Sequence, residues 1–283
     1  MKTISFENVS FSYNRDTKSK DQCLRDISFS IKDQNVLGVF GPSGSGKTTL
    51  IFLFCGLLKP DHGRILIDGE NPWEQKDAWE KLMSRMGAAF QFPEDMFFQE
   101  SVSEEFIEIL KKKGHSTEDA ELMAIKAIEW TGLDPGSIWH RHTMRLSYGQ
   151  LRLLSLALLW AQDWDFLILD EPTVGLDCLL KEKILKDLIS RCHQPGKLGI
   201  ITSHDTSTLL PLVDHAIILN KGEIALYDSR EGILRKWESI SSLNLSIPAL
   251  AELSIKLKKA GLPLSQIWQN QNQALKDILD MMP

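Results

Sequence analysis

The amino-acid sequence predicts an α/β protein with a parallel sheet at its centre. Short apolar runs that fit buried strands alternate with longer helical patterns, which is typical of a parallel sheet covered by helices on both faces. Of the 283 residues, 43% are hydrophobic and 25% are charged, as in ordinary globular proteins that bury a substantial core. One strand runs into a glycine-rich segment and then a helix, the connection expected at the ligand-binding edge of an open α/β sheet.

The N-terminal part of the chain predicts strands before its first helix. Residues 3–13 and 24–31 alternate apolar and polar side chains, and residues 35–40 (NVLGVF) form a short apolar run that fits a buried strand. Residues 49–58 then predict a buried helix, and residues 64–67 predict a further strand.

The middle and the end of the chain are dominated by helical patterns. Residues 74–161 are mostly helical, with Ser116 or Thr117 as the N-cap of one helix. A polar, helix-rich tail follows Arg235. Between them, three apolar runs predict strands, at residues 166–169, 198–201 and 216–219. We therefore expect an α/β core that is interrupted by a helical insertion and followed by a helical tail.

Charge and composition exclude several kinds of protein. The formal net charge of −6 argues against a general nucleic-acid binder, which presents a basic face, so we expect no nucleic-acid partner. The four cysteines are scattered without a C-x-x-C pair, which argues against a zinc site or a disulfide framework and favours small buried thiols. The longest apolar stretch, residues 153–161, is far shorter than the roughly 20 residues of a membrane helix.

A glycine-rich phosphate-binding loop is the strongest signal in the sequence. The pattern G-x-x-x-x-G-K-T stands between a predicted strand and a predicted helix, and its residues are Gly41, Pro42, Ser43, Gly44, Ser45, Gly46, Lys47 and Thr48. Glycines let backbone N–H groups turn inward around a polyphosphate, and the helix N-terminus adds a favourable dipole. We expect Lys47 to reach the β- and γ-phosphates, Thr48 to bind Mg²⁺, and Thr49 to complete the contact set.

Two consecutive carboxylates follow the predicted strand 166–169. A buried strand that ends in Asp170 and Glu171 delivers both to the carboxyl edge of the sheet. We expect Asp170 to hold Mg²⁺ and Glu171 to act as the general base toward an attacking water. Solvated acids at strand ends are common, and the phosphate loop is what favours the catalytic interpretation.

A third segment identifies a family. Residues 146–150 (LSYGQ) resemble the LSGGQ signature of the ATP-binding cassette (ABC) ATPases and precede Asp170 by about 20 residues. Other motifs of that family stand in order around it: Tyr13 as the aromatic that stacks on adenine, Gln91 as the Q-loop, Gly175-Leu176-Asp177 as the D-loop, and His204 as the switch histidine. The chain departs from the pattern at Tyr148, where the family has its first signature glycine.

The resemblance implies a fold, a site and a second copy. The fold is a P-loop NTPase (RecA-like) core with an N-terminal antiparallel β subdomain, a helical signature subdomain and a C-terminal helical extension. In this family two cassettes stack head to tail around ATP and Mg²⁺, so the signature residues Ser147, Gly149 and Gln150 would bind a γ-phosphate held by the other cassette. Asp177 would couple the two sites, Gln91 and His204 would take part in catalysis, and Gln91 would also contact Mg²⁺.

Finer matches point to one branch of the family. Residues 90–98 (FQFPEDMFF), residues 171–177 (EPTVGLD) and the tail resemble the ATPases of energy-coupling-factor (ECF) transporters, which include cobalt and nickel importers. This resemblance implies an ATPase domain over residues 1–235, with its helical subdomain at about 92–160. Residues 236–283 would form an extension that helps two ATPases, identical or paralogous, to dimerise.

The implied activity is ATP hydrolysis that energises uptake of a vitamin or a transition-metal ion. The implied partners are an integral-membrane coupling protein and a substrate-binding membrane protein, and the implied location is the cytoplasmic side of the cell membrane. Two alternatives stay open: the ATPase of another ABC transporter, including an exporter, and a soluble ABC ATPase without a role in transport.

Overall fold

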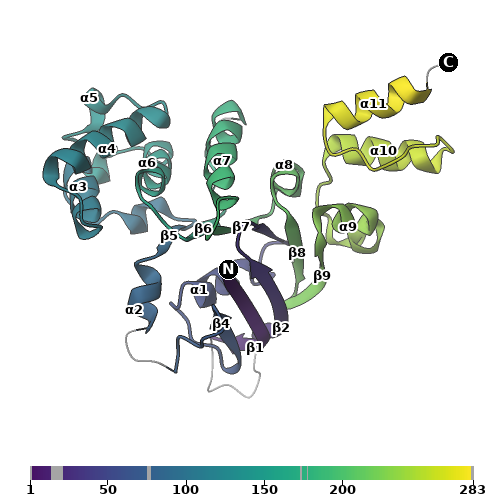
Figure 1. Cartoon of the computed structure of the whole chain (residues 1–283), viewed down its shortest axis with the longest axis horizontal. Helices are drawn as coiled ribbons and strands as arrows, with labels where there is room; N and C mark the ends of the chain where they lie inside the picture. The colour runs from purple at the N-terminus through teal and green to yellow at the C-terminus, as the bar shows by residue number, and fades with distance from the viewer. Residues whose placement is uncertain (1, 14–21, 75–77, 173, 177, 282–283) are drawn as a thin grey trace.

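The computed structural model describes residues 2–13, 22–74, 78–172, 174–176 and 178–281. A larger sheet lies at its centre, with a smaller sheet packed below it in the view of Figure 1. The larger sheet has the strand order β5-β6-β7-β3-β8-β9 and is parallel except for the last pair. Its strands are β3 (Val36–Phe40), β5 (Met86–Ala89), β6 (Phe166–Asp170), β7 (Leu198–Ser203), β8 (His215–Asn220) and β9 (Glu223–Ser229).

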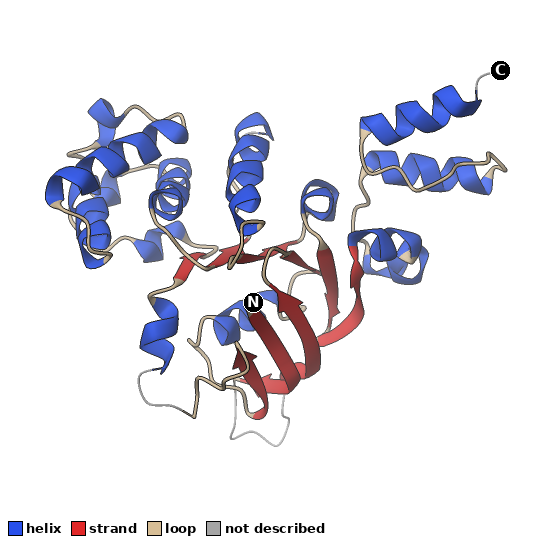
Figure 2. Ribbon diagram, in the orientation of Figure 1, coloured by secondary structure: helices blue, strands red, loops and turns tan. Residues whose placement is uncertain are grey.

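The smaller sheet is antiparallel and lies near the N-terminus. Its strand order is β2-β1-β4, formed by β1 (Thr3–Ser12), β2 (Gln22–Lys32) and β4 (His62–Ile67). Helix α1 (Lys47–Phe54) lies between the two sheets, as Figure 2 shows. The predicted α/β core with an N-terminal antiparallel unit is therefore confirmed.

Two hydrophobic layers hold this arrangement together. Alternate residues of β3 face opposite ways, so Leu37 and Val39 pack toward α1 and the smaller sheet, while Val36 and Phe40 pack toward the helices on the other face. Burial of apolar surface on both faces explains why the parallel strands are continuous apolar runs.

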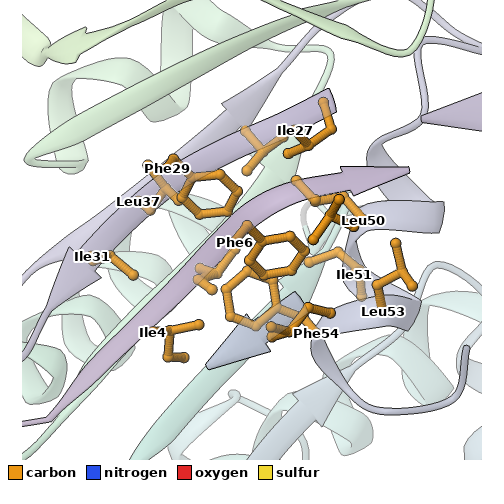
Figure 3. Packing of buried hydrophobic residues seen from close by; sticks show 14 of the residues in the cluster. Ile4, Phe6, Ile27, Phe29, Ile31, Leu37, Leu50, Ile51, Leu53 and Phe54 are labelled. Carbon is orange, nitrogen blue, oxygen red and sulfur yellow. The ribbon is translucent and has the colours of Figure 1, made fainter. Parts of the chain in front are cut away.

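An aromatic cluster packs the smaller sheet onto α1. The Phe6 ring centroid lies 4.8 Å from that of Phe29 and 4.9 Å from that of Phe54 (Figure 3). The three residues come from β1, β2 and α1, so their contacts join both strands to the helix that follows the phosphate loop.

Helices α6 to α9 cover the far face of the larger sheet. They are α6 (Tyr148–Ala161), α7 (Cys178–Cys192), α8 (Thr206–Leu209) and α9 (Arg230–Arg235). Side chains of all four contribute to one buried cluster together with β3, β6, β7 and β8. This layer fixes the start of α6, which carries the signature sequence, relative to the sheet.

The helical insertion gathers at one end of the molecule, around its own buried cluster. Ser101 and Ser116 cap helices α3 and α4 by accepting hydrogen bonds from Glu104 N and Asp119 N. The N-cap prediction at Ser116 is thus confirmed. The segments leading to and forming this end are α2 (Ala78–Met83), η1 (Pro93–Met96), α3 (Val102–Lys112), α4 (Thr117–Trp130), α5 (Pro135–Ile138) and η2 (Thr143–Arg145).

The C-terminal helices lie at the opposite end from the helical insertion (Figure 1). The elements are η4 (Trp237–Leu243), α10 (Ala249–Lys259) and α11 (Gln271–Met281), and η3 (Leu210–Leu212) lies earlier, before β8. Buried Trp268 joins α10 to α11, because its backbone N–H donates to Ser254 Oγ and its indole N–H donates to Asp277 at 2.8 Å.

Three details differ from the sequence-based expectations. The middle of the chain contains strand β5, and a further strand, β9, follows β8. β5 reads Met-Gly-Ala-Ala, which has no β-branched residue, so only its parallel pairing with β6 makes it a strand. Helix α1 ends at Phe54 rather than near residue 58, since Gly56 adopts a left-handed conformation with φ 68°.

The described helices and cysteines bear on two further expectations from the sequence. None of their helices combines the length and apolar character needed to cross a bilayer. Burial raises the pKa of both Cys55 and Cys192 to about 12, so these two are the inert thiols expected. Cys23 is half-buried, with its sulfur 3.1 Å from Thr49 Oγ1.

Candidate active site

Four neighbouring loops at the carboxyl edge of the larger sheet carry the predicted site. The strand order β5-β6-β7-β3 places Gln91, the pair Asp170 and Glu171, His204 and the phosphate loop next to one another. These segments are spread between residues 41 and 204 of the sequence, so their proximity follows from the order of the strands. Parallel strands end at the same edge, which is where open α/β sheets bind ligands.

The phosphate loop ends at the N-terminus of α1. Gly46 is the N-cap residue, with φ 106°, and a Cβ atom there would lie 2.6 Å from Leu24 Cδ2, so the position requires glycine. Lys47 Nζ donates to Gly41 O at 2.9 Å and to Pro42 O at 3.3 Å. The lysine thus lies folded back over the loop, where it can pass from carbonyl oxygens to a phosphate.

The Lys47 side chain is largely buried. Desolvation lowers the pKa of Lys47, and the nearby carboxylates of Glu171 and Asp170 act in the opposite direction. A buried ammonium that lacks a full set of anionic partners favours an anionic ligand such as a phosphate.

Asp170 offers an oxygen that suits a metal ion. The residue is fully buried, its Oδ1 accepts a hydrogen bond from the Thr202 hydroxyl, and Oδ2 is buried without a hydrogen-bond partner among the described residues. Burial raises the pKa of Asp170, while the hydroxyls of Thr202 and Thr48 oppose that rise. A buried, unpartnered carboxylate oxygen next to a threonine hydroxyl is the hard donor set that Mg²⁺ prefers, so these residues fit Mg²⁺.

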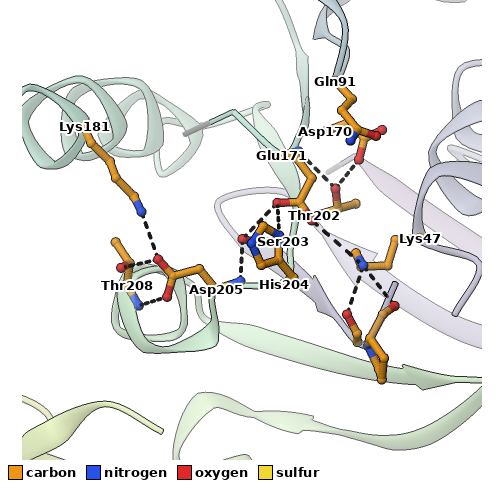
Figure 4. Close-up of polar contacts among 12 residues, drawn as sticks. Lys47, Gln91, Asp170, Glu171, Lys181, Thr202, Ser203, His204, Asp205 and Thr208 are labelled. Atoms are coloured by element: carbon orange, nitrogen blue, oxygen red, sulfur yellow. Dashed lines mark hydrogen bonds and ion pairs between the residues drawn. The ribbon is translucent and has the colours of Figure 1, made fainter. Parts of the chain in front are cut away.

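Glu171 lies between the phosphate-loop lysine and the histidine (Figure 4). Its Oε2 lies 3.0 Å from His204 Nδ1 and accepts a hydrogen bond from Ser203 Oγ at 3.3 Å. Its Oε1 lies 3.9 Å from Lys47 Nζ. Glu171 has φ 49°, a left-handed conformation that is strained for a non-glycine residue and that occurs at functional sites.

A second ion pair stabilises the loop that carries His204. Lys181 Nζ on α7 lies 2.9 Å from Asp205 Oδ2, and Ser207 and Thr208 also donate to Asp205. Partial burial would raise the pKa of Asp205, but these hydrogen bonds outweigh it and hold the pKa well below its ordinary value. The charged carboxylate therefore caps α8 and holds the backbone beside His204.

The signature sequence forms the first turn of α6. Ser147 is the N-cap, its Oγ accepts from Gln150 N, and Gln150 Oε1 accepts from Ser147 N, which is a complete capping box. The Gln150 side chain is thus engaged within its own helix, whereas Ser147 stays exposed and Gly149 half-buried. The capping box does not use the N–H groups of Tyr148 and Gly149, so this helix start suits an anion.

A groove of about 650 Å³ runs along the phosphate loop. Residues 41–45 and His204 line it, together with residues 220–221 and 242–245. None of the described signature residues, 146–150, lies in this groove. The phosphate loop and the signature turn of one chain therefore do not line the same groove.

The remaining predicted contacts lie at the rim or outside the described residues. Tyr13 is 57% exposed, with its hydroxyl 3.2 Å from Thr49 Oγ1 and its ring edge-on to Phe11. An exposed aromatic ring at this position suits stacking on a flat base. Asp177 lies outside the described residues.

Sequence reasoning missed two side chains that support the site. Thr202 donates to Asp170 Oδ1, and its own Oγ1 accepts from Glu171 N at 3.3 Å. Arg152 is fully buried and donates to the backbone oxygens of Phe90 and Gln91. The sequence could have revealed Arg152, because a lone arginine within the apolar run of α6 is a buried charge that needs partners. It held no comparable signal for Thr202.

The site defines a class of protein. A phosphate loop, a buried aspartate with a free oxygen, and a glutamate held by a histidine at one sheet edge form a nucleotide-binding ATPase site. The chain belongs to the ABC transporter family, which matches residues 24–174, and it is an ABC-type ATPase.

Individual proteins of known name support this assignment. The chain is 35% identical to the energy-coupling factor transporter ATP-binding protein EcfA2 of Caldanaerobacter subterraneus subsp. tengcongensis, over 92% of this chain and 91% of the relative. It is 26% identical to cbiO1 of Clostridium perfringens, part of the ABC transporter complex cbiONQ, with a TM-score of 0.69 over 90% of this chain and 98% of that one. A dimeric ATP-binding cassette in a post-hydrolysis state with ADP and Pi, at 24% identity, shares the fold (TM-score 0.72, 80% of this chain and 98% of that one).

Proposed function

We propose that this chain is the ATP-hydrolysing subunit of an ECF-type importer that takes up a vitamin or a transition-metal ion. The observation that carries the proposal is the convergence of the phosphate loop, Asp170, Glu171 and His204 at one sheet edge, in a chain whose most similar named relatives include ECF transporter ATP-binding proteins. The site supports ATP hydrolysis as the source of energy. The similarity to those relatives supports the ECF type of transporter.

The residues take distinct roles toward ATP and Mg²⁺. The backbone of residues 41–46 and the Lys47 ammonium bind the phosphates, and Tyr13 stacks on the base. Thr48, Asp170 and Gln91 hold Mg²⁺, which neutralises the charge that develops on the phosphate oxygens.

Glu171 is the proposed general base toward the attacking water. His204 lies within hydrogen-bond distance of Glu171 and on the same groove as the phosphate loop, so it can orient that carboxylate and reach the γ-phosphate. The burial of Glu171 excludes bulk water from the carboxylate and so strengthens its electrostatic interactions.

The separation of the two phosphate-binding elements supports a head-to-tail dimer. Because the signature turn lies outside the groove of its own phosphate loop, Ser147, Gly149 and Gln150 need a nucleotide from a second cassette, identical or paralogous. ATP would close the dimer, hydrolysis would release it, and Asp177 would couple the two sites. Residues 236–283 would add to the dimer contact, and exposed Leu275, Ile278 and Leu279 on α11 offer apolar surface for it.

A membrane partner would dock beside Gln91. Phe98 is 82% exposed and Phe92 is also exposed, while Met96 and Phe97 pack partly into the molecule. Two exposed phenylalanines next to the acidic residues Glu94 and Asp95 suit the amphipathic helix of an integral-membrane coupling protein. The chain would then act on the cytoplasmic side of the membrane, with a substrate-binding membrane protein in the same complex.

Affinity purification tests this proposal directly. The tagged chain is recovered from detergent-solubilised membranes of its source, and we expect a polytopic protein and a substrate-binding membrane protein to accompany it. Phe98→Ala should lose these partners and keep its ATPase rate, whereas the control Leu122→Ala, at an exposed leucine on α4, should keep both. Recovery from the soluble fraction alone, or with ribosomes or nucleic acid, would refute the transport function and leave the ATPase assignment intact.

A further inference from the structure

Tyr148 connects the signature turn to the segment that carries Gln91. Its hydroxyl donates a hydrogen bond to Gln91 O at 3.0 Å, although the two residues are 57 positions apart. The same hydroxyl accepts a hydrogen bond from Arg152 Nη2 at 3.1 Å. The first turn of α6 is therefore attached to the backbone of Gln91 through the phenol.

Arg152 adds further hydrogen bonds between α6 and the backbone of Phe90 and Gln91. Its buried guanidinium donates to Phe90 O at 2.7 Å and to Gln91 O, and it lies 5.7 Å from the centroid of the Tyr148 ring. No carboxylate among the described residues pairs with Arg152, so its buried charge depends on these carbonyl and ring contacts. The tyrosine, the arginine and the two backbone carbonyls thus form one hydrogen-bonded unit.

The Tyr148 ring also lies beside a third loop. A Cβ atom built on Gly175 would lie 3.3 Å from Tyr148 Cε1, so the ring occupies the space that a side chain at position 175 would need, two residues before Asp177 in the sequence. A glycine at position 148, as in the LSGGQ pattern, would provide neither the ring contact nor the hydroxyl. The hydroxyl contact to Gln91 is therefore specific to a chain with tyrosine at this position.

We propose that Tyr148 is a positioning residue that holds Gln91 in place for Mg²⁺-nucleotide, acting through the backbone of Gln91 from the turn that would receive the partner's γ-phosphate. The inference rests on the proposed contact of Gln91 with Mg²⁺. It assigns a function to the one residue by which the signature departs from the family pattern.

The test uses the 283-residue chain with four variants: Tyr148→Phe, Gln91→Ala, the double variant and Tyr227→Phe. Tyr227→Phe is the matched control, because Tyr227 is as exposed as Tyr148 and its hydroxyl also donates to a backbone carbonyl, that of Ser30. A fluorescent ATP analogue is titrated into each protein at increasing Mg²⁺ and again in EDTA. Thermal unfolding midpoints and ATPase rates are measured in parallel.

We expect Tyr148→Phe to raise the Mg²⁺ concentration for half-maximal nucleotide binding about three- to fivefold, the effect of losing one hydrogen bond. Affinity in EDTA and the behaviour of Tyr227→Phe should match the wild type. In the Gln91→Ala background the tyrosine has no side chain to position, so Tyr148→Phe should add no further shift.

Three other outcomes would overturn the inference, each in a distinct way. Wild-type behaviour of Tyr148→Phe, when Gln91→Ala does shift the Mg²⁺ requirement, refutes the role of Tyr148 and leaves that of Gln91. An equal shift by Tyr148→Phe in both backgrounds shows that the tyrosine acts elsewhere. No shift by Gln91→Ala refutes the proposed Mg²⁺ contact and the inference that depends on it.

Discussion

Replacing Glu171 by glutamine is the most direct test of the proposed chemistry. Glutamine has nearly the same size and can still accept the hydrogen bond from Ser203 Oγ, so the geometry around His204 is largely preserved. The substitution removes the basic carboxylate and the negative charge 3.9 Å from Lys47 Nζ. It therefore separates general-base chemistry from nucleotide binding.

The expected loss of activity is large, whereas binding should be retained. A positioned general base contributes about 10²- to 10⁴-fold, so kcat should fall at least about 100-fold, close to 3 kcal/mol in the activation barrier. ATP affinity should stay the same or tighten, because an unopposed Lys47 ammonium favours phosphate. The fall in kcat is measured by phosphate release at saturating ATP, and the ATP affinity by titration with a fluorescent ATP analogue. Because the variant binds ATP without hydrolysing it, we also expect an ATP-bound dimer, which size-exclusion chromatography with ATP would detect.

Glu182→Gln serves as the control for this experiment. Glu182 on α7 is exposed and forms an i,i+4 ion pair with Lys186, which contributes little to stability, so its replacement should leave kcat unchanged. Full ATPase activity in Glu171→Gln would refute the assignment of the base. A loss of ATP binding equal to the loss of turnover would show that Glu171 acts in binding instead.

Three further predictions concern binding, folding and pH dependence. Lys47→Ala should weaken ATP binding at least about tenfold by calorimetry, since it removes the ammonium of the phosphate loop; undiminished affinity would contradict the phosphate-loop assignment. Gly63→Ala should lower the free energy of unfolding in urea by more than about 2 kcal/mol, because a Cβ at this left-handed residue would lie 2.3 Å from Asn8 O. Gly69→Ala, also left-handed but with no atom within 4 Å of that Cβ, should cost only about 1 kcal/mol, and equal losses would refute the clash. Hydrogen bonds from Ser265 and Trp268 hold the pKa of Asp277 below its ordinary value, so this carboxylate stabilises the C-terminal helices above about pH 4 and loses that effect as pH falls. Asp277→Asn should therefore flatten the pH dependence of amide protection in α11, and an unchanged profile would refute the role of Asp277.

Local sequence patterns predicted those elements whose formation depends on their own residues. The glycines of the phosphate loop, the N-cap at Ser116 and the apolar run of β3 each carry their physical cause within a few neighbouring positions. β5 shows the opposite case, because Met-Gly-Ala-Ala has little strand preference and becomes a strand by pairing with β6. The expectation that residues 74–161 are mostly helical holds, and local preference alone did not single out this strand.

The candidate site divides in the same way. Motif order in the sequence predicted Lys47, Asp170, Glu171 and His204 as site residues, because their residue types and neighbours suit phosphate chemistry. The sequence carried no sign that Thr202 would bind Asp170, because that contact depends on the pairing of β6 with β7. Contacts of this kind are set by strand order and register, which no single segment encodes.

The sequence by itself determined the chemistry of this protein: a phosphate loop, two carboxylates and a signature turn, each specified by residue types at short spacing. Only the tertiary structure decided which of these groups meet. The strand order β5-β6-β7-β3 brings four distant loops to one edge, and the packing of α6 attaches Tyr148 and Arg152 to Gln91. The physical reason is that burial of apolar faces and sheet pairing act between segments far apart in the chain, so a local pattern specifies a group and the core specifies its neighbours.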